Sequence, residues 1–115
     1  MYTMMQVCRE LDMTYQTLKF YCNEGLVPNV KRDHNNRRVF DEKDVKWIKD
    51  LTCLKKCGMS IQEMKKYLEL CLQGEATIVS RKKMLARKQE ELRASIKELE
   101  DSISYIGWKQ NFYDE

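Results

Sequence analysis

Apolar residues recur with a helical period over the first 25 residues, and they predict two short helices. The apolar positions lie three or four residues apart on one face of each helix: Met4, Val7, Cys8 and Leu11, then Leu18 and Cys22. Thr3 and Thr14 stand just ahead, where a hydroxyl can accept a hydrogen bond from a free amide of the first turn. Gly25 and Pro28 end the second helix.

The outer face of the second helix is polar and basic. Tyr15, Gln16, Lys19 and Phe20 are left pointing outward when Leu18 is buried. Two short helices joined by a tight turn, with such a face on the second, are typical of a DNA-binding helix-turn-helix. Small helical hairpins also occur as plain packing units, so this pattern leaves both interpretations open.

The next segment, residues 30–40, predicts a hairpin with a basic edge. Asn and Asp favour turns, because they tolerate left-handed backbone and hydrogen-bond locally, and they fill the centre of the segment together with His34. Phe40 is expected to turn inward and fix the base of the hairpin. Four cations flank the turn: Lys31, Arg32, Arg37 and Arg38. Phosphate is the counter-charge that such a wing suits, and a solvated loop is the alternative.

Two further helices follow the hairpin. Asp41 begins the first and Gly58 ends it, whereas Ser60 and Glu63 form a capping box for the second, which Gly74 ends. The expected buried positions are Val45, Ile48, Leu51, Thr52 and Leu54, then Ile61, Met64, Leu68 and Leu72. Residues 1–74 are therefore predicted to form a winged helix-turn-helix domain in a mainly α fold.

The last third of the chain, residues 75–115, carries a heptad repeat. The repeat predicts one helix from Thr77 to about Tyr113, roughly 55 Å long. Such a helix is too long to bury its stripe against a domain of 74 residues, so a homodimer is expected, and a monomeric helical hairpin is the alternative. The predicted dimer interface is Ile78, Leu85, Leu92, Ile96, Leu99, Ile103 and Ile106.

Charge and composition narrow the function. The 115 residues carry a formal charge of +3, and the whole excess lies in residues 1–60, where the helix-turn-helix is predicted. No apolar run matches a membrane span and no signal peptide precedes the domain, so we expect a cytoplasmic protein. No Cys–His pair stands at plausible spacing and no phosphate-binding glycine loop is present. We therefore expect no enzyme activity and no cofactor.

The order of these motifs resembles the MerR family of bacterial transcription regulators. The resemblance runs from residue 2 to about residue 72, through Thr17-Leu18-Lys19-Phe20-Tyr21, Gly25-Leu26-Val27-Pro28, Asn36-Arg37-Arg38-Val39-Phe40 and Gly58-Met59-Ser60-Ile61. Departures exist: the family usually has Arg, Tyr, Tyr and Glu at positions 19–22, and often Gly-Tyr at positions 36 and 37. Phe20 lacks the hydroxyl that would reach a phosphate, and Arg37 adds a charge that compensates.

The resemblance implies a mechanism and a set of contacts. It implies antiparallel pairing of the long helices, RNA polymerase as a partner, and activation by bending and untwisting an overlong promoter spacer. A symmetric dimer also predicts a palindromic site in double-stranded promoter DNA. The predicted DNA-binding residues are Thr14, Tyr15, Gln16, Thr17, Lys19, Tyr21, Arg32, Arg37 and Arg38. Of these, Tyr15, Gln16 and Lys19 are expected at base edges or adjacent phosphates. The residues expected at the DNA backbone are Tyr21, Arg32, Arg37 and Arg38.

The five cysteines suggest a thiol chemistry. An odd number in an intracellular chain argues against a disulfide framework. Cys8 and Cys22 are expected in the core, as small apolar side chains. No cysteine follows Cys71, whereas metal-sensing relatives of the family use cysteines near both ends of the long helix.

Cys53 and Cys57 are the candidate sensor thiols. They lie one helical turn apart, and lysines at positions 46, 49, 55 and 56 surround them in sequence, which favours a reactive thiolate. Cys53 also matches the third-helix cysteine of a MerR-like subgroup that responds to aldehydes and other thiol-reactive electrophiles. The alternative for Cys53 is an ordinary core thiol. The alternatives for the protein are a metal-responsive regulator and an architectural DNA-bending protein that senses nothing. For a closed metal site, two cysteines without a histidine are too few ligands.

Overall fold

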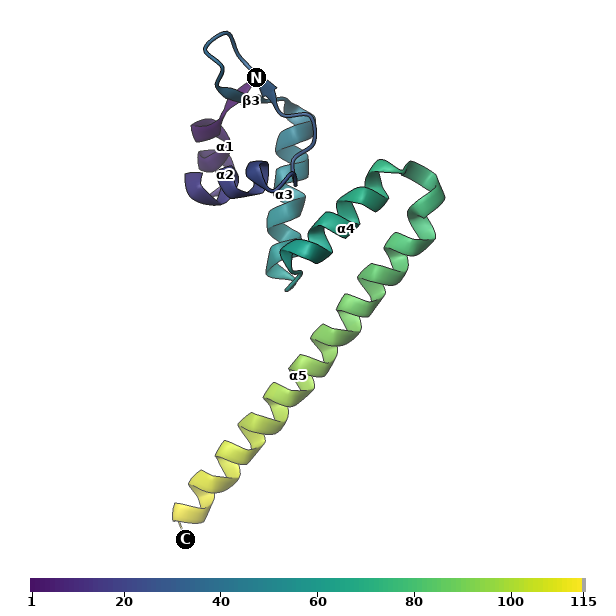
Figure 1. Ribbon diagram of the computed structural model, residues 1–115. Helices are drawn as coiled ribbons and strands as arrows, with labels where there is room; N and C mark the ends of the chain where they lie inside the picture. The colour runs from purple at the N-terminus through teal and green to yellow at the C-terminus, as the bar shows by residue number, and fades with distance from the viewer. Residues whose placement is uncertain (115) are drawn as a thin grey trace.

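The computed structural model describes residues 1–114 as a winged helical head and a long projecting helix (Figure 1). The head contains two short helices, a small sheet and two longer helices, and a 3-10 turn leads into the last helix. In chain order the elements are β1 Tyr2–Thr3, α1 Met4–Leu11, α2 Tyr15–Asn23, β2 Lys31–Arg32, β3 Arg38–Phe40, α3 Glu42–Lys56, α4 Ile61–Leu72, η1 Gly74–Thr77 and α5 Ile78–Asp114.

Side-chain caps start the first four helices where the sequence predicts them. The Thr14 hydroxyl accepts from the amide of Thr17 at 3.1 Å, and the Ser60 hydroxyl accepts from the amide of Glu63 at 3.1 Å. Full capping boxes stand at Thr3, Asp41 and Ser60. Because each cap is made within four residues, these helix starts follow from local sequence alone.

The wing is a three-stranded antiparallel sheet in the order β1-β3-β2. The predicted hairpin is confirmed, with Arg32 opposite Arg38 and the turn closed by the Asp33 carboxylate, which accepts the amides of Asn35 and Arg37 at 2.9 and 3.0 Å. The third strand was not predicted. β1 pairs with β3, and this joins the first residues of the chain to the wing.

The core of the head lies between α1, α2, the wing, α3 and the start of α4. Its fully buried side chains are Phe40, Leu18, Leu26, Ile48, Leu51, Met59, Met64 and Val7. Trp47 Nε1 donates to the carbonyl oxygen of Leu26 at 2.7 Å, which ties the loop after α2 to α3. Phe40 turns inward as predicted. The prediction for Leu72 is wrong: its side chain is 64% exposed, because α4 meets α5 through its other faces.

A polar joint links α4 to α5. The buried Thr77 hydroxyl donates to the carbonyl oxygen of Leu70, and Arg81 donates to the Gly74 carbonyl oxygen at 2.7 Å and to the Thr77 hydroxyl at 3.1 Å. Lys88 binds Glu63 at 3.3 Å, further along the same pair of helices. These contacts satisfy carbonyl groups that the end of α4 leaves free, so they fix the direction in which α5 leaves the head.

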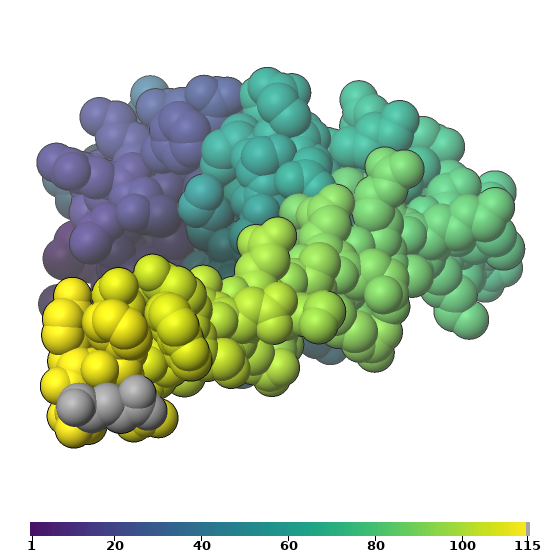
Figure 2. Space-filling view, turned by 90° about the horizontal axis from the view of Figure 1, so that it is seen from below, coloured from purple at the N-terminus to yellow at the C-terminus, as the bar shows by residue number. Residues whose placement is uncertain are grey.

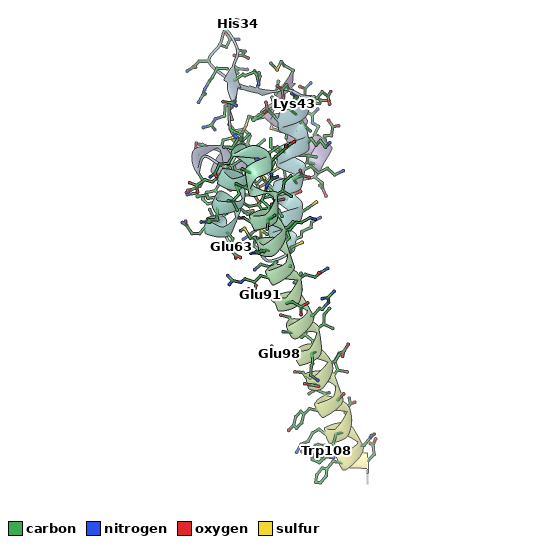
Figure 3. The ribbon with its side chains drawn as sticks, turned by 90° about the vertical axis from the view of Figure 1, so that its right-hand side faces the viewer. His34, Lys43, Glu63, Glu91, Glu98 and Trp108 are labelled. Atoms are coloured by element: carbon green, nitrogen blue, oxygen red, sulfur yellow. The ribbon has the colours of Figure 1, made fainter. Side chains whose placement is uncertain are left out.

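Beyond Lys88, α5 leaves the head and extends away from it. No residue from Gln89 to Asp114 is buried, and the space-filling view from below shows α5 running across the near face (Figure 2). Figure 3 places His34 on the wing and Trp108 on α5 at opposite ends of the molecule. The radius of gyration is 19.7 Å, whereas a compact chain of this length has about 13 Å. In the described residues, none of the helices combines the length and apolar character that crossing a bilayer requires.

Replacing Ser60 with alanine tests the capping box of α4. Ser60→Ala removes the acceptor for the Glu63 amide, and we expect the free energy of unfolding to fall by about 1 kcal/mol in urea denaturation at one fixed protein concentration. Ser104→Ala, at an exposed position of α5, is the matched control and should change it by less than about 0.5 kcal/mol. Equal effects of the two changes would contradict a capping role.

Candidate nucleic-acid interface

The second helix presents a fixed polar face to solvent. Leu18 is fully buried and anchors α2 in the core, and the Thr14 cap sets where the helix begins. Tyr15, Gln16 and Lys19 therefore point outward, with Tyr15 47% exposed. The predicted outer face of α2 is confirmed by this exposure.

Two of the three wing arginines, Arg32 and Arg38, are held by hydrogen bonds of their guanidinium groups to neutral partners. Arg32 donates to the carbonyl oxygen of Asn36 at 3.0 Å, and Arg38 donates to the side-chain oxygen of Asn23 at 2.6 Å. Within residues 1–114, none of Arg32, Arg37 and Arg38 forms an ion pair. Three cations without a carboxylate partner, on a rigid hairpin, are positioned to meet phosphate.

The fourth wing cation has a structural role. Lys31 binds Asp41 at 2.9 Å and Asp44 at 3.5 Å. Two hydrogen bonds, the stronger from the Asp44 amide and the other from Lys31, hold the pKa of Asp41 below its usual value. Lys31 thus ties the wing to the first turn of α3, which the sequence pattern did not distinguish from the three arginines.

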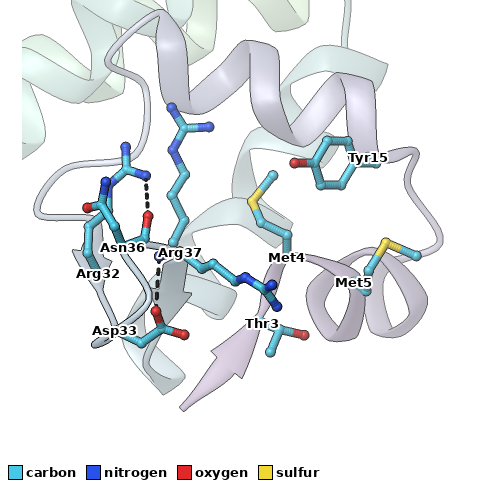
Figure 4. Close-up of a pocket in the computed structure, with 9 residues that line it drawn as sticks. Thr3, Met4, Met5, Tyr15, Arg32, Asp33, Asn36 and Arg37 are labelled. Atoms are coloured by element: carbon cyan, nitrogen blue, oxygen red, sulfur yellow. Dashed lines mark hydrogen bonds between the residues drawn. The ribbon is translucent and has the colours of Figure 1, made fainter.

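A hollow of about 460 Å³ brings the helix and the wing together (Figure 4). Its lining comes from the wing, the start of α1 and the start of α2: Thr3, Met4, Met5, Tyr15, Arg32, Asp33, Asn36, Arg37 and Arg38. Asp33 is the one carboxylate in this lining, and hydrogen bonds from the Arg37 and Asn35 amides lower its pKa. The hollow is therefore basic. Met5, exposed at the start of α1, also lines this hollow and was not among the predicted contacts.

Tyr21 differs from the other predicted contacts, because its ring belongs to the core. The side chain is only 4% exposed, and burial raises its pKa. It borders a second hollow, which lies between α2 and the start of α4 and is also lined by Thr14, Gln16, Thr17, Phe20, Lys55 and Ile61. Tyr21 is thus first a packing residue, and its contact with the DNA backbone stays a prediction.

The cysteines fall into two groups. Cys8 is buried and Cys22 is half-buried, and in both the burial raises the pKa of the thiol. Cys53 and Cys57 are exposed, so the alternative that Cys53 is an ordinary core thiol is wrong. Cys71 is half-buried beside Arg81, at the joint of α4 and α5.

Cys53 lies in a shallow hollow between α1 and α3. The lysines that share its lining are Lys46, Lys49 and Lys56, whereas Lys55 lines the hollow beside α2 and does not face the thiol. Cys57 forms the C-terminal cap of α3, one turn further on. Among residues 1–114, no three His, Cys, Asp or Glu side chains are grouped so that they could hold a metal ion.

Comparison with known proteins identifies the family. A family model described as "MerR HTH family regulatory protein" matches residues 2–71, and a second, described as "MerR, DNA binding", matches residues 45–106. The chain belongs to the MerR family.

Two relatives and one solved structure place this MerR chain more closely. It is 34% identical to an uncharacterized HTH-type transcriptional regulator of Haemophilus influenzae, over 97% of this chain and 83% of that one. It is 37% identical to the HTH-type transcriptional regulator AdhR of Bacillus subtilis, over 76% of this chain and 62% of AdhR. It also resembles the crystal structure of HiNmlR, described as a MerR family regulator lacking the sensor domain, bound to promoter DNA. That match has a TM-score of 0.80 and 34% identity, and it covers 98% of this chain and 90% of HiNmlR.

These matches confirm the predicted class. The MerR chain is a sequence-specific DNA-binding transcription regulator with a small antiparallel wing and a long C-terminal helix. The relatives are regulators, and the prediction that this chain is not an enzyme is confirmed by them.

Replacing Arg37 tests the wing. For Arg37→Gln we expect weaker binding to DNA of every sequence and a slope of log affinity against log salt that falls by about 1, because one phosphate contact is lost. The measurement is fluorescence anisotropy over a salt series, with a site selected by the wild-type protein from random DNA. Arg9→Gln removes an exposed arginine whose hollow is lined by Tyr2, Gln6 and Glu10, and should leave the slope unchanged. Equal slopes for wild type and Arg37→Gln would refute the contact.

Proposed function

We propose that the protein acts as a homodimer on a palindromic promoter site, activates transcription by distorting the promoter DNA, and responds to thiol-reactive electrophiles such as aldehydes through Cys53. The observation that carries this proposal is the apolar seam of α5, whose side chains all remain at least 40% exposed in the described structure. The DNA-binding face then supports action on the promoter, and the exposed Cys53 thiol supports the response to electrophiles. RNA polymerase is the partner that would bind the distorted promoter.

The seam supports dimerisation through α5. Its side chains are between 40% and 71% exposed: Ile78, Leu85, Leu92, Ile96, Leu99, Ile103 and Ile106. Exposed apolar stripes of this length mark an interface, because burying each side chain against a partner contributes roughly 1.5–3 kcal/mol. The heptad spacing fits a second helix of the same kind.

The charges along α5 favour antiparallel pairing. The first part of the helix is basic, with Glu90 and Glu91 set against Arg81, Lys82, Lys83, Arg87, Lys88 and Arg93. The second part is acidic, with Lys97 and Lys109 set against Glu98, Glu100, Asp101 and Asp114. A parallel dimer would place like charges side by side, whereas an antiparallel one sets the basic part of each helix against the acidic part of the other.

Two heads related by a two-fold axis bind two half-sites of a palindrome. In each head, α2 offers Tyr15, Gln16 and Lys19 to the major groove, and the wing offers its arginines to the backbone. HiNmlR, which shares the fold along nearly the whole chain, was crystallised on promoter DNA. If α5 holds the two heads at a fixed separation, a promoter spacer longer than that separation must bend and untwist to reach both heads. The free energy of binding would offset the cost of this deformation.

The chemistry of Cys53 suits an electrophile. The thiolate adds to the carbonyl carbon of an aldehyde, so that a C–S bond forms, the C=O π bond breaks, and the oxygen takes a proton from water to give a hemithioacetal. Lys46, Lys49 and Lys56 line the same hollow, together with the carboxylates of Glu10, Asp12 and Glu42. Added bulk between α1 and α3 would change how the head packs, and with it the geometry of the two heads on DNA.

The dimer is tested with a seam variant and a matched control. For Ile96→Glu we expect the mass in sedimentation equilibrium to fall from twice 13.8 kDa toward 13.8 kDa, because a carboxylate would face the partner's apolar seam. Promoter affinity should fall with it. Ala94→Glu introduces the same charge on the opposite side of α5 and should stay dimeric. A wild-type mass of 13.8 kDa at micromolar concentration would contradict the proposal.

The sensor is tested by comparing the two exposed thiols. We expect formaldehyde to change run-off transcription with the wild-type protein and with Cys57→Ser, and to have no effect with Cys53→Ser, because only Cys53 lies between α1 and α3. Mass spectrometry after trapping with N-ethylmaleimide should show faster modification of Cys53. If Cys53→Ser responds as wild type does, the thiol role is refuted while the DNA-binding role stands. A wild-type protein that binds and bends DNA but ignores every electrophile would instead be an architectural protein.

A further inference from the structure

The two antiparallel helices α4 and α5 enclose a groove that the DNA-binding face does not use. Its volume is about 620 Å³, within the range of roughly 300–1,000 Å³ that is usual for small-molecule sites. Leu70 and Met84, both half-buried, form an apolar floor. The polar lining residues are Gln62, Glu63, Lys66, Ser80, Lys83, Arg87 and Lys88.

The charges of this groove are unbalanced. Glu63 is its one carboxylate, and it is already engaged, since it binds Lys88 at 3.3 Å and accepts the Ser60 amide at 3.0 Å. In the part of the chain that the structure describes, Lys66, Lys83 and Arg87 take part in no ion pair. One end of the groove is therefore neutralised, and the rest keeps three cations beside an apolar floor.

The groove stays open when the seam of α5 is covered. In the heptad that contains Leu85 and Leu92, the groove residues Lys83, Met84 and Arg87 fall on the side of the helix opposite the seam. α4 contributes Lys66 and Leu70 from the other wall. A second copy that pairs along the seam would leave this surface accessible. Figure 3 shows Glu63 near the point where α5 leaves the head and Glu91 further along α5.

We propose that this groove binds a small organic carboxylate with an apolar body. The carboxylate would sit among Lys66, Lys83 and Arg87, where charge-assisted hydrogen bonds are available to it. The hydrocarbon part would cover Leu70 and the thioether of Met84, which adapts to irregular apolar shapes. A nucleic-acid backbone matches the cations and makes no use of an apolar floor, so the observations favour the organic anion. The site is independent of Cys53 and of dimerisation.

Met84 provides a direct reporter. It is the one methionine of α5 among the seven in the chain, so methyl-labelled methionine gives a single resonance in the groove. The probe is 2-naphthoate, titrated into the full-length protein and followed by NMR. We expect a saturable shift of the Met84 methyl resonance with 2-naphthoate, and none with uncharged 2-naphthamide or with inorganic phosphate. Phosphate carries the charge without the apolar body.

Two double variants complete the experiment. Lys83→Gln with Arg87→Gln should weaken naphthoate binding by about tenfold or more, because two charge-assisted contacts are lost. Lys43→Gln with Lys97→Gln removes the same charge outside the groove and should bind as wild type does. Both pairs replace exposed side chains, so the methyl spectrum of the core methionines should be unchanged and serves as the check on folding.

Three results would overturn the proposal. The first is a Met84 resonance that does not move at millimolar naphthoate, and the second is equal affinity in the two double variants. The third is loss of promoter affinity in Lys83→Gln with Arg87→Gln, to the extent seen for Arg37→Gln, without naphthoate binding in the wild type. That result would assign the groove to the DNA backbone.

Discussion

The 37-residue helix α5 carries an apolar stripe that the described part of the chain leaves largely exposed, and the other features of the structure depend on this exposure. The head covers α5 only as far as Lys88, and every later seam residue is exposed to solvent. Apolar area left in water lowers stability and invites association. The polar joint of Thr77, Arg81 and Gly74 fixes the angle at which the stripe leaves the head. That angle would set the distance between two heads and so the spacing of the half-sites.

Ion pairing with carboxylates distinguishes the cations that hold the fold together from those that are available to an anionic ligand. Lys31, Lys65 and Lys88 each bind a carboxylate outside their own element. Lys31 and Lys65 join parts of the head, and Lys88 joins α5 to the head. Arg32, Arg37 and Arg38 on the wing have no such partner among the described residues, and neither do Lys66, Lys83 and Arg87 of the α4–α5 groove. An unpaired cation on a rigid element is available for an anionic ligand at little cost in reorganisation. Formal charge alone, +3 over the whole chain, does not reveal this division.

Cys53 and the α4–α5 groove lie on different sides of the head. Cys53 faces the hollow between α1 and α3, and Met84 faces the groove between α4 and α5. A covalent change at the first and a bound anion at the second would both act on elements that connect the DNA-binding face to α5. The fold thus offers two places where small-molecule chemistry could alter the relation of head and helix.

Local sequence determined much of this fold. The starts of the first four helices follow from Thr3, Thr14, Asp41 and Ser60, because a cap is a hydrogen bond made within three or four residues. The wing turn and the heptad seam are likewise set by short-range preference and by period. The family resemblance rested on the same local motifs, and the comparisons confirmed it.

Tertiary structure alone decided the contacts between residues far apart in sequence. The pairing of Tyr2 with Phe40 made a third strand from two residues that carry no strand pattern. Tyr21 became a core residue and Leu72 a surface one, because the packing of neighbouring helices, not period, set which face was covered. The partners of Lys31 and Lys88 lie 10 to 25 residues away. Sequence period assigns a side chain to a face of its own helix, and only the packed structure shows what that face meets.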